Sequence, residues 1–373
     1  MNNIQFYQFD KITKFIDYRG KTPKKTESGI PLITAKNIKF GYLSEQPKEF
    51  IAESNYDEWM TRGIPNKGDI LFTTEAPLGN VCILNTNEKR AFAQRAIIFQ
   101  PISHDIYCSP YLFYYLMSPI FMHELDSRKT GTTVKGIKTS ILKKFKIPLP
   151  PFQEQKRIVA KLDSLFAKIA QSIALHQQNI DEAEGFMESV LNEVLGELEG
   201  KYEKKIWNEV LTIKNGKHYK DVIDDNGRYP IYGSGGIMNY ANKYICNENS
   251  VIIGRKGTIN SPIFVKEKFW NMDTAFGIEA NQDKLNPMFL FYFTQHFNFL
   301  DLNKSTTLPS LAKTRLLDIM MVLPPLSIQQ KTVTYLDQLS QKTEKLKQAQ
   351  QEKMQSLKDL KASLLDRAFR GEL

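Results

Sequence analysis

The chain has 373 residues, of which 42% are hydrophobic, and a formal net charge of +9. This hydrophobic content is enough for real cores, and no run of about 18 apolar residues is present to span a membrane. The first residues lack the basic and then apolar profile of a signal peptide, and three scattered cysteines, Cys82, Cys108 and Cys246, suit neither a disulfide framework nor a zinc site. We therefore expect a cytoplasmic protein with no membrane association.

Residues 1–148 are predicted to form a domain of short strands and turns. Apolar runs bounded by Gly, Pro and Asn occur at 30–33, 69–72, 81–84 and 96–99. A proline at the start of the aromatic segment 110–116 predicts a buried helix there.

Residues 149–200 are predicted to form one long helix, and residues 323–373 a second one. Apolar or near-apolar positions recur every three or four residues, with one 4-4 step from Ile169 to Ile173, which is typical of a coiled coil with a stutter. The predicted seam positions are Ile158, Leu162, Leu165, Ile169, Ile173, His176, Ile180, Ala183, Met187, Val190 and Val194, and then Leu336, Leu339, Thr343, Leu346, Met354, Leu357, Leu360 and Leu364. Because a long helix with one apolar stripe is unstable alone, we expect the two helices to pair, antiparallel, with a domain at either end.

Residues 201–322 repeat the order of elements of the first domain. Strands are predicted at 229–232, 251–253 and 262–265, and a helix at 287–293. The motif that opens each long helix is also repeated: Leu-Pro-Pro-x-x-x-Gln begins at Leu149 and again at Leu323, an offset of 174 residues (323 − 149). Further matches are Leu162-Asp163 with Leu336-Asp337, and Gly196-Glu197-Leu198 with Gly371-Glu372-Leu373. A period this long exceeds that of a solenoid repeat and indicates two whole domains.

Basic charge is concentrated in the two predicted domains. Residues 1–148 carry 21 Lys and Arg against 14 Asp and Glu, and residues 201–322 carry 16 against 12. Residues 149–200 carry 4 against 9, whereas residues 323–373 carry 9 against 6, so the two helices complement each other. The domains favour a polyanionic partner, although a modest positive balance also serves solubility alone.

Catalytic motifs are absent or incomplete. Leu149-Pro150-Pro151-Phe152 is similar to the Pro-Pro-aromatic loop of amino-methyltransferases, but Leu149 cannot accept the hydrogen bond that this loop needs from the target amine. Helix initiation by proline is the better interpretation. The glycine-rich segments 233–236 and 254–258 fit no nucleotide-binding pattern, and the five histidines form no i, i+4 pair. We therefore expect no catalysis, no cofactor and no metal.

Polar loops suited to DNA recur at corresponding places in both domains. Glycine lets backbone amides approach phosphate, Thr and Ser donate to phosphate oxygens, and Lys, Arg and Asn contact base edges. A solvated turn is the alternative for any single loop, and the paired recurrence favours DNA. In the first domain four such loops are predicted, at 18–25, 34–37, 73–80 and 129–135. Their candidate contact residues are Arg19, Lys21, Thr22, Lys36, Asn37, Thr73, Thr74, Asn80, Lys129, Thr132, Thr133 and Lys135. In the second they are Lys217, His218, Tyr219, Tyr232, Ser234, Arg255, Lys256, Thr258, Lys304, Thr306 and Thr307.

Over its whole length the chain resembles the specificity subunit of type I restriction-modification systems. The resemblance rests on the repeated helix openings, the Gly-Glu-Leu endings and a repeated domain pattern. In the first copy Gly29-Ile30-Pro31-Leu32-Ile33-Thr34 precedes Gly68-Asp69-Ile70-Leu71, and in the second Arg228-Tyr229-Pro230-Ile231-Tyr232 precedes Asn249-Ser250-Val251-Ile252-Ile253-Gly254-Arg255-Lys256-Gly257. It implies an α+β protein with two mixed β-rich target recognition domains, separated by two long helices that form an antiparallel coiled coil, with pseudo-twofold internal duplication. The implied boundaries are 1–148 and 201–322 for the recognition domains, 149–200 for the central conserved helix and 323–373 for the C-terminal one.

The resemblance also implies a function. Each recognition domain would read one half of a bipartite site in double-stranded DNA, and the helices would set the spacing as a ruler. Two methylation subunits, which bind S-adenosylmethionine, would dock on the chain, and restriction subunits that hydrolyse ATP would join for cleavage. Arg255-Lys256-Gly257 matches a loop near DNA in this family, whereas the first domain has Thr74-Glu75-Ala76 there, so its contact must differ. Two alternatives remain: a DNA methyltransferase acting alone, favoured if the isolated chain binds S-adenosylmethionine, and a scaffold without a nucleic-acid role, favoured if DNA fails to shift the protein.

Overall fold

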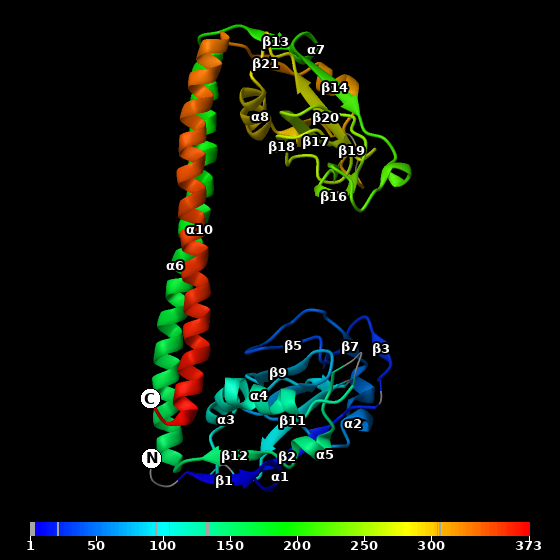
Figure 1. Cartoon of the computed structure of the whole chain (residues 1–373). Coiled ribbons are helices and arrows are strands. Elements are labelled where there is room, and N and C mark those ends of the chain that lie inside the picture. Colours follow the sequence, from blue (N-terminus) through cyan, green and yellow to red (C-terminus); the bar gives the residue numbers. More distant parts are fainter. Residues whose placement is uncertain are drawn as a thin grey trace. The chain divides into compact units, whose positions relative to one another are not determined.

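The computed structural model describes residues 4–20, 22–93, 95–103, 105–131, 135–303, 305 and 307–373. It divides into two compact units. The first unit comprises Met1–Leu175 and Glu352–Leu373, and the second comprises His176–Gln351. Each unit contains one β-rich domain and one segment of each of the two long helices, α6 (Phe152–Glu199) and α10 (Leu326–Arg370) (Figure 1). No helix within the described ranges is both long enough and apolar enough to cross a membrane.

The β-rich domain of the first unit is built on a four-stranded antiparallel sheet in the order β2-β11-β8-β9. A second sheet, β10-β4-β7-β3, includes the parallel pair β4 and β10, and β1 pairs with β12 just before α6. The elements are β1 (Gln5–Gln8), α1 (Phe9–Ile12), β2 (Thr13–Asp17), β3 (Lys25–Thr26), β4 (Ile30–Ile33), β5 (Ile38–Lys39), β6 (Tyr42–Leu43), β7 (Phe50–Ile51), α2 (Tyr56–Trp59), β8 (Ile70–Thr74), β9 (Leu78–Ile83), β10 (Ala91–Phe92), β11 (Ala96–Pro101), α3 (Ser109–Met117), α4 (Pro119–Ser127), α5 (Thr139–Leu142) and β12 (Lys146–Leu149).

The β-rich domain of the second unit follows the same plan. Its four-stranded antiparallel sheet has the order β14-β20-β17-β18, the parallel pair is β15 with β19, and β13 pairs with β21 just before α10. The elements are β13 (Lys204–Ile206), α7 (Trp207–Val210), β14 (Leu211–Asn215), β15 (Tyr229–Gly233), β16 (Gly236–Ala241), β17 (Ser250–Gly254), β18 (Ile263–Val265), β19 (Trp270–Asn271), β20 (Ala275–Ala280), α8 (Pro287–His296), α9 (Lys313–Leu317) and β21 (Met320–Val322). The predicted strands and both buried helices are confirmed, and the matching topology confirms the internal duplication.

Each domain shares its core with the long helices. In the first unit Ile158, Leu162 and Phe166 of α6 join Leu364 and Leu365 of α10 in the cluster that covers one face of the main sheet. In the second unit Leu191 and Leu195 of α6 and Val333 and Leu336 of α10 do the same. Because these helix segments bury their apolar faces against a domain and against each other, neither depends on its own helix propensity alone.

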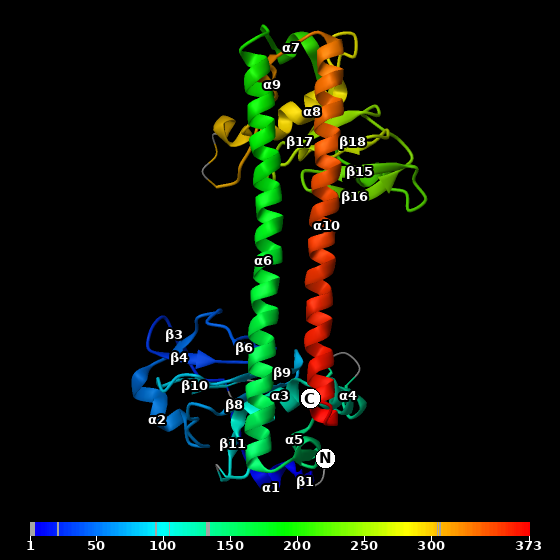
Figure 2. The same ribbon diagram turned by 90° about the vertical axis from the view of Figure 1, so that its left-hand side faces the viewer.

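The two long helices run antiparallel within each unit (Figure 2). In the first unit Arg157 donates to the backbone carbonyl of Leu373 (2.8 Å), and the ammonium of Lys361 lies over the Phe166 ring. In the second unit His176 contacts Gln350 (2.5 Å), and Glu184 pairs with Lys347 (2.8 Å). Successive contacts therefore pair increasing residue numbers of α6 with decreasing residue numbers of α10, which is the antiparallel arrangement of the predicted coiled coil.

Two predicted seam positions are wrong. Leu346 and Leu360 are each 46% exposed, whereas Thr343 and Gln350 are buried. The buried stripe passes from Thr343 directly to Gln350, one heptad later, and Lys347 is turned toward Glu184 of α6. The polar middle of α10 thus faces α6, and buried polar groups of this kind fix register in coiled coils.

The repeated Leu-Pro-Pro-x-x-x-Gln motif forms the same clamp in both units. Buried Gln155 accepts a hydrogen bond from the amide of Cys108 (3.1 Å) and donates to the carbonyls of Ile106 (3.1 Å) and Pro150 (3.0 Å).

Buried Gln329 accepts from the amide of Asn286 (2.8 Å) and donates to the carbonyls of Lys284 (2.9 Å) and Pro324 (2.8 Å). The motif therefore fastens the start of each long helix to the loop before α3 or α8. The boundaries of the four predicted segments stay a prediction.

Candidate nucleic-acid interface

Three of the four predicted loops of the first domain line one groove of about 390 Å³. Because β11 runs antiparallel to both β2 and β8, its first residues lie beside the last residues of those strands. The groove is lined by Arg19, Gly20, Thr22, Thr34, Ala35, Lys36, Glu75, Ala76 and Arg95. The sheet topology thus gathers polar residues that are far apart in sequence. We call this the first groove.

Arg19 is held in a fixed orientation beside the first groove. Its guanidinium donates to both carboxylate oxygens of Asp17 (2.8 and 2.6 Å), to the hydroxyl of Thr74 (3.2 Å) and to the hydroxyl of Thr139. Burial raises the pKa of Asp17, but the hydrogen bonds and charge of Arg19 outweigh it, so the pKa of this carboxyl lies below its ordinary value. Arg19 is therefore a preorganised cation beside an ionised partner.

Arg95 is a groove residue that the sequence did not single out. It has a left-handed backbone (φ +63°), and its Nε lies 3.1 Å from a carboxylate oxygen of Glu75. Both side chains are about half exposed, 52% and 42%. No motif marks Arg95, because its place in the groove follows only from the pairing of β8 with β11.

Several predicted contact residues shape the loops instead of facing solvent. Asn37 is buried, accepts from the amide of Thr34 (3.1 Å) and donates to the carbonyl of Pro47 (3.0 Å). Thr73 is buried and accepts from the amide of Asn80 (2.9 Å), while Asn80 donates to the carbonyl of Ile38 (2.8 Å).

Thr74 is also buried, and its hydroxyl accepts a hydrogen bond from the Arg19 guanidinium. We therefore do not expect the side chains of Asn37, Thr73 and Thr74 to touch DNA in this conformation, which corrects their predicted role. Lys36 and Thr22 are exposed on the lining of the first groove.

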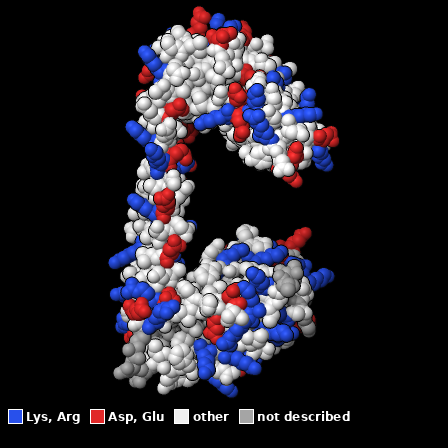
Figure 3. All heavy atoms as spheres, in the orientation of Figure 1, with Lys and Arg blue, Asp and Glu red and all other residues white. Residues whose placement is uncertain are grey.

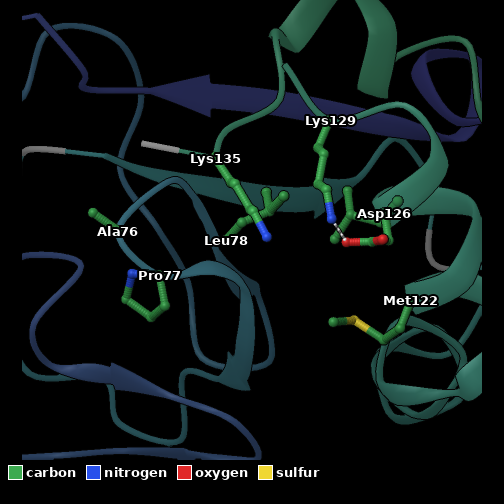
Figure 4. Close-up of a pocket in the computed structure, with 8 residues that line it drawn as sticks. Ala76, Pro77, Leu78, Met122, Asp126, Lys129 and Lys135 are labelled. Atoms are coloured by element: carbon green, nitrogen blue, oxygen red, sulfur yellow. Dashed lines mark hydrogen bonds and ion pairs between the residues drawn. The ribbon is translucent and has the colours of Figure 1, made fainter. Parts of the chain in front are cut away.

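Two described residues of the fourth predicted loop, Lys129 and Lys135, line a neighbouring cavity of about 460 Å³, which shares Ala76 with the first groove. Pro77, Leu78 and Met122 form apolar walls there, and Lys129 and Lys135 project into the same space (Figure 4). Lys129 pairs with Asp126, whereas Lys135 is exposed. The candidates Lys21, Thr132, Thr133, Lys304 and Thr306 lie outside the described residues.

In the second domain the same backbone scaffold carries different side chains. The amide of Thr74 donates to the carbonyl of Arg95 (3.1 Å), and the carbonyl of Thr74 accepts from the amide of Ile137 (3.0 Å). Correspondingly, the amide of Arg255 donates to the carbonyl of Thr274 (2.8 Å), and its carbonyl accepts from the amide of Leu311 (2.9 Å).

In each domain the next residue along the chain forms an equivalent bridge, Glu75 with Gly136 and Lys256 with Ser310. Thr74 thus corresponds to Arg255, Glu75 to Lys256, and Arg95 to Thr274.

The predicted loops of the second domain also converge. The amide of Lys217 donates to the carbonyl of Asn271 (3.0 Å), which ties this loop to β19. Gly254 is packed so closely that an added Cβ would lie 1.9 Å from the carbonyl oxygen of Thr258 and 3.1 Å from Cβ of Ser234. Only glycine fits there, and its presence brings the loops after β15 and β17 together.

The candidates of the second domain differ in exposure. Lys217, His218, Lys256, Thr258 and Thr307 are exposed, and Tyr219, Tyr232, Ser234 and Arg255 are partly buried.

Arg255 packs its guanidinium over the Phe276 ring, with 5.8 Å to the centroid. Tyr232 packs edge-on against Phe269, and burial raises the pKa of its hydroxyl, which stays a neutral donor.

Both domains also expose large apolar side chains on the segment that follows the parallel strand. After β4 these are Phe40 (46% exposed) and Tyr42 (61%), and after β15 they are Ile237 (50%) and Met238 (62%). Sequence reasoning missed them because an apolar residue in a short strand is usually buried. Their recurrence beside the polar loops is a second shared feature of the two domains.

Charge is distributed differently on the two domains. Lys and Arg side chains are prominent over the visible face of the first domain, whereas positive and negative side chains alternate on the second (Figure 3). Across the described part of the chain, no group of three or more His, Cys, Asp or Glu side chains is placed to hold a metal ion.

A family model described as the type I restriction modification DNA specificity domain matches residues 7–184 and residues 199–355. These two matches cover most of the chain and correspond to its two β-rich domains. The protein therefore belongs to the type I restriction-modification specificity family and contains two recognition domains. Members of this family are the non-catalytic DNA-recognition components of type I systems.

Individual relatives agree with this assignment. The chain is 26% identical over 390 residues to the type I restriction enzyme MjaIX specificity subunit of Methanocaldococcus jannaschii, with 92% of this chain and 87% of the relative covered. It is 29% identical over 146 residues to the MjaVIII specificity subunit of that organism (37% and 33% covered). It is 30% identical over 150 residues to the putative specificity subunit S.HindORF215P of Haemophilus influenzae (38% and 39% covered). The last two alignments span well under half of each relative's length.

Solved structures show the same fold. A chain from a structure described as the basis of complex assembly and conformational transition of the type I R-M system matches with a TM-score of 0.78 and 22% identity, over 100% of this chain and 99% of that one. The HsdS subunit from Thermoanaerobacter tengcongensis matches with a TM-score of 0.56 and 20% identity, over 100% and 98%.

Proposed function

We propose that this chain reads a bipartite site in double-stranded DNA, with each recognition domain contacting one half-site through its convergent loops. The observation that carries the proposal is the shared loop scaffold with dissimilar side chains. Glu75 and Arg95 in the first domain occupy the positions of Lys256 and Thr274 in the second. A common scaffold lets both domains approach DNA in the same way, and different side chains at equivalent places select different bases.

The chemistry of the loops suits a duplex. Lys36, Lys135 and Lys256 are exposed cations for phosphate, and Arg19 and Arg255 are oriented by neighbouring groups so that they lose little freedom on binding. The remaining predicted contact residues whose side chains are exposed or partly buried belong to the same proposed surface.

We further propose that the paired helices set the spacing between the half-sites and carry the protein partners. Two methylation subunits would dock on the chain, and restriction subunits would join in the full complex. Exposed apolar side chains on the long helices support a protein partner: Leu175, Phe186, Leu346 and Leu360 are each between 46% and 54% exposed.

The proposal is tested with the chain purified together with its methylation subunits. Methylation of duplexes that contain both half-sites, one half-site or neither is measured at physiological salt, where non-specific binding is weak. We expect efficient methylation only when both halves are present at one spacing. Equal methylation of all duplexes would contradict the proposal.

A further inference from the structure

The first groove contains a carboxylate where a surface for phosphate would carry none. Glu75 lines the groove together with Arg19, Lys36 and Arg95, and it is 42% exposed. A carboxylate close to DNA phosphates is repelled, unless it meets a hydrogen-bond donor on the DNA itself. The donors that DNA offers in its major groove are the exocyclic amino groups of cytosine and adenine.

We propose that Glu75 and Arg95 are the specificity-determining pair of the first recognition domain. On DNA the Glu75 carboxylate accepts a hydrogen bond from an exocyclic amino group, N4 of cytosine or N6 of adenine. Arg95 donates to an acceptor on a neighbouring base edge. This inference rests on the proposed function and names the residues through which the first domain reads its bases.

The free protein keeps the pair ready for this exchange. Arg95 lies 3.1 Å from the Glu75 carboxylate and neutralises it, so the groove is not repulsive before DNA arrives. Both side chains remain about half in solvent, so the ion pair is weak and easily exchanged for contacts with a base.

The backbone at this place is also unusual. Arg95 has φ +63°, a left-handed conformation that costs a non-glycine residue free energy and that commonly occurs at functional sites. Its counterpart Thr274 is not among the described non-glycine residues with positive φ. At this position the left-handed backbone therefore occurs in the first domain and not in the second, and Arg95 lines the first groove.

Comparison of the two domains supports the same assignment. In the second domain Arg255 and Lys256 follow β17 directly, and an uncharged Thr274 directly precedes β20. In the first domain Glu75 follows β8, and the cation Arg95 directly precedes β11. The charges at equivalent positions therefore differ while the scaffold is the same, as expected if these positions choose the base and the scaffold positions the DNA.

The test uses the full chain with its methylation subunits and a library of duplexes randomised across both half-sites. Wild type, Glu75→Gln and Arg95→Ala are compared. The matched control is Glu124→Gln, which breaks the Arg128–Glu124 pair at the C-terminal end of α4, where neither residue lines the first groove. Thermal unfolding of each variant checks that it folds.

We expect Glu75→Gln and Arg95→Ala each to lose discrimination at one or two base pairs of one half-site, by roughly tenfold or more, while the other half-site and the control stay as in wild type. A uniform loss of affinity for all sequences would assign both residues to phosphate or positioning roles and overturn the proposal, and so would unchanged specificity in both variants. If wild type itself showed no preference in either half, the proposed function would fail instead.

Discussion

The repeated glutamine clamp gives a sharp prediction about stability. Gln155→Met keeps the length of the side chain but removes three hydrogen bonds, to Cys108, Ile106 and Pro150, in a buried place. Each bond contributes about 1 kcal/mol net, and backbone groups left buried without a partner add to the loss. We therefore expect the free energy of unfolding of the first unit to fall by about 3–5 kcal/mol, and its melting temperature by roughly 10 °C.

Hydrogen–deuterium exchange measures this prediction residue by residue, together with thermal unfolding. In Gln155→Met the amide of Cys108 should lose protection, while the amide of Asn286 in the second unit keeps it. Gln329→Met should do the reverse, because Gln329 accepts from Asn286. Gln153→Met, at an exposed position of the same helix, is the control and should change neither. A loss below about 1 kcal/mol in Gln155→Met would refute the argument that the motif is a clamp.

Three further predictions concern the interface, the helices and pH. Replacing Arg255 and Lys256 with Ala should weaken methylation by roughly tenfold or more, with the loss of recognition confined to one half-site. Methylation of duplexes mutated in either half-site measures this, and a loss of recognition at both half-sites would contradict the prediction. Removing seven residues from the middle of each long helix should shorten the spacer between the half-sites by about 3 base pairs, because each helical residue rises ~1.5 Å. Methylome sequencing measures the spacer, and an unchanged spacer would contradict the proposal that the helices set the spacing. The pKa of Asp17 lies below the ordinary 3.8, so its pairing with Arg19 stabilises the folded state fully above that value and is lost as pH falls through the lower, folded pKa. Melting curves between pH 2 and pH 6 should therefore show less acid destabilisation from this site in Asp17→Asn, and identical slopes in both proteins would contradict the assignment.

Much of the fold follows from local sequence patterns. Short apolar runs such as 96–99 predict strands because the sheet buries them on both faces, and the observed β11 is buried over most of its length. The repeat of Leu-Pro-Pro-x-x-x-Gln predicts a duplication, although its role as a clamp depends on backbone groups of Ile106 and Cys108 that no sequence pattern marks.

The errors have physical reasons as well. Spacing alone predicts Leu346 in the coiled-coil seam, but Thr343 and Gln350 occupy the buried positions and Leu346 is exposed to solvent. Thr73 has the chemistry of a phosphate contact, yet a hydroxyl also stabilises a tight turn, and here it donates to the carbonyl of Pro77 in the turn after β8. The Glu75–Arg95 pair joins a residue just after β8 to one just before β11, so it depends on the register of these two strands, which no local sequence pattern gives.

Sequencing of methylated bases in cells that express this chain with its methylation subunits tests the central claim most directly. We predict one modified motif made of two defined half-sequences separated by a fixed number of unspecified bases. A continuous, single-part motif, or a genome without methylation that depends on this chain, would contradict the account.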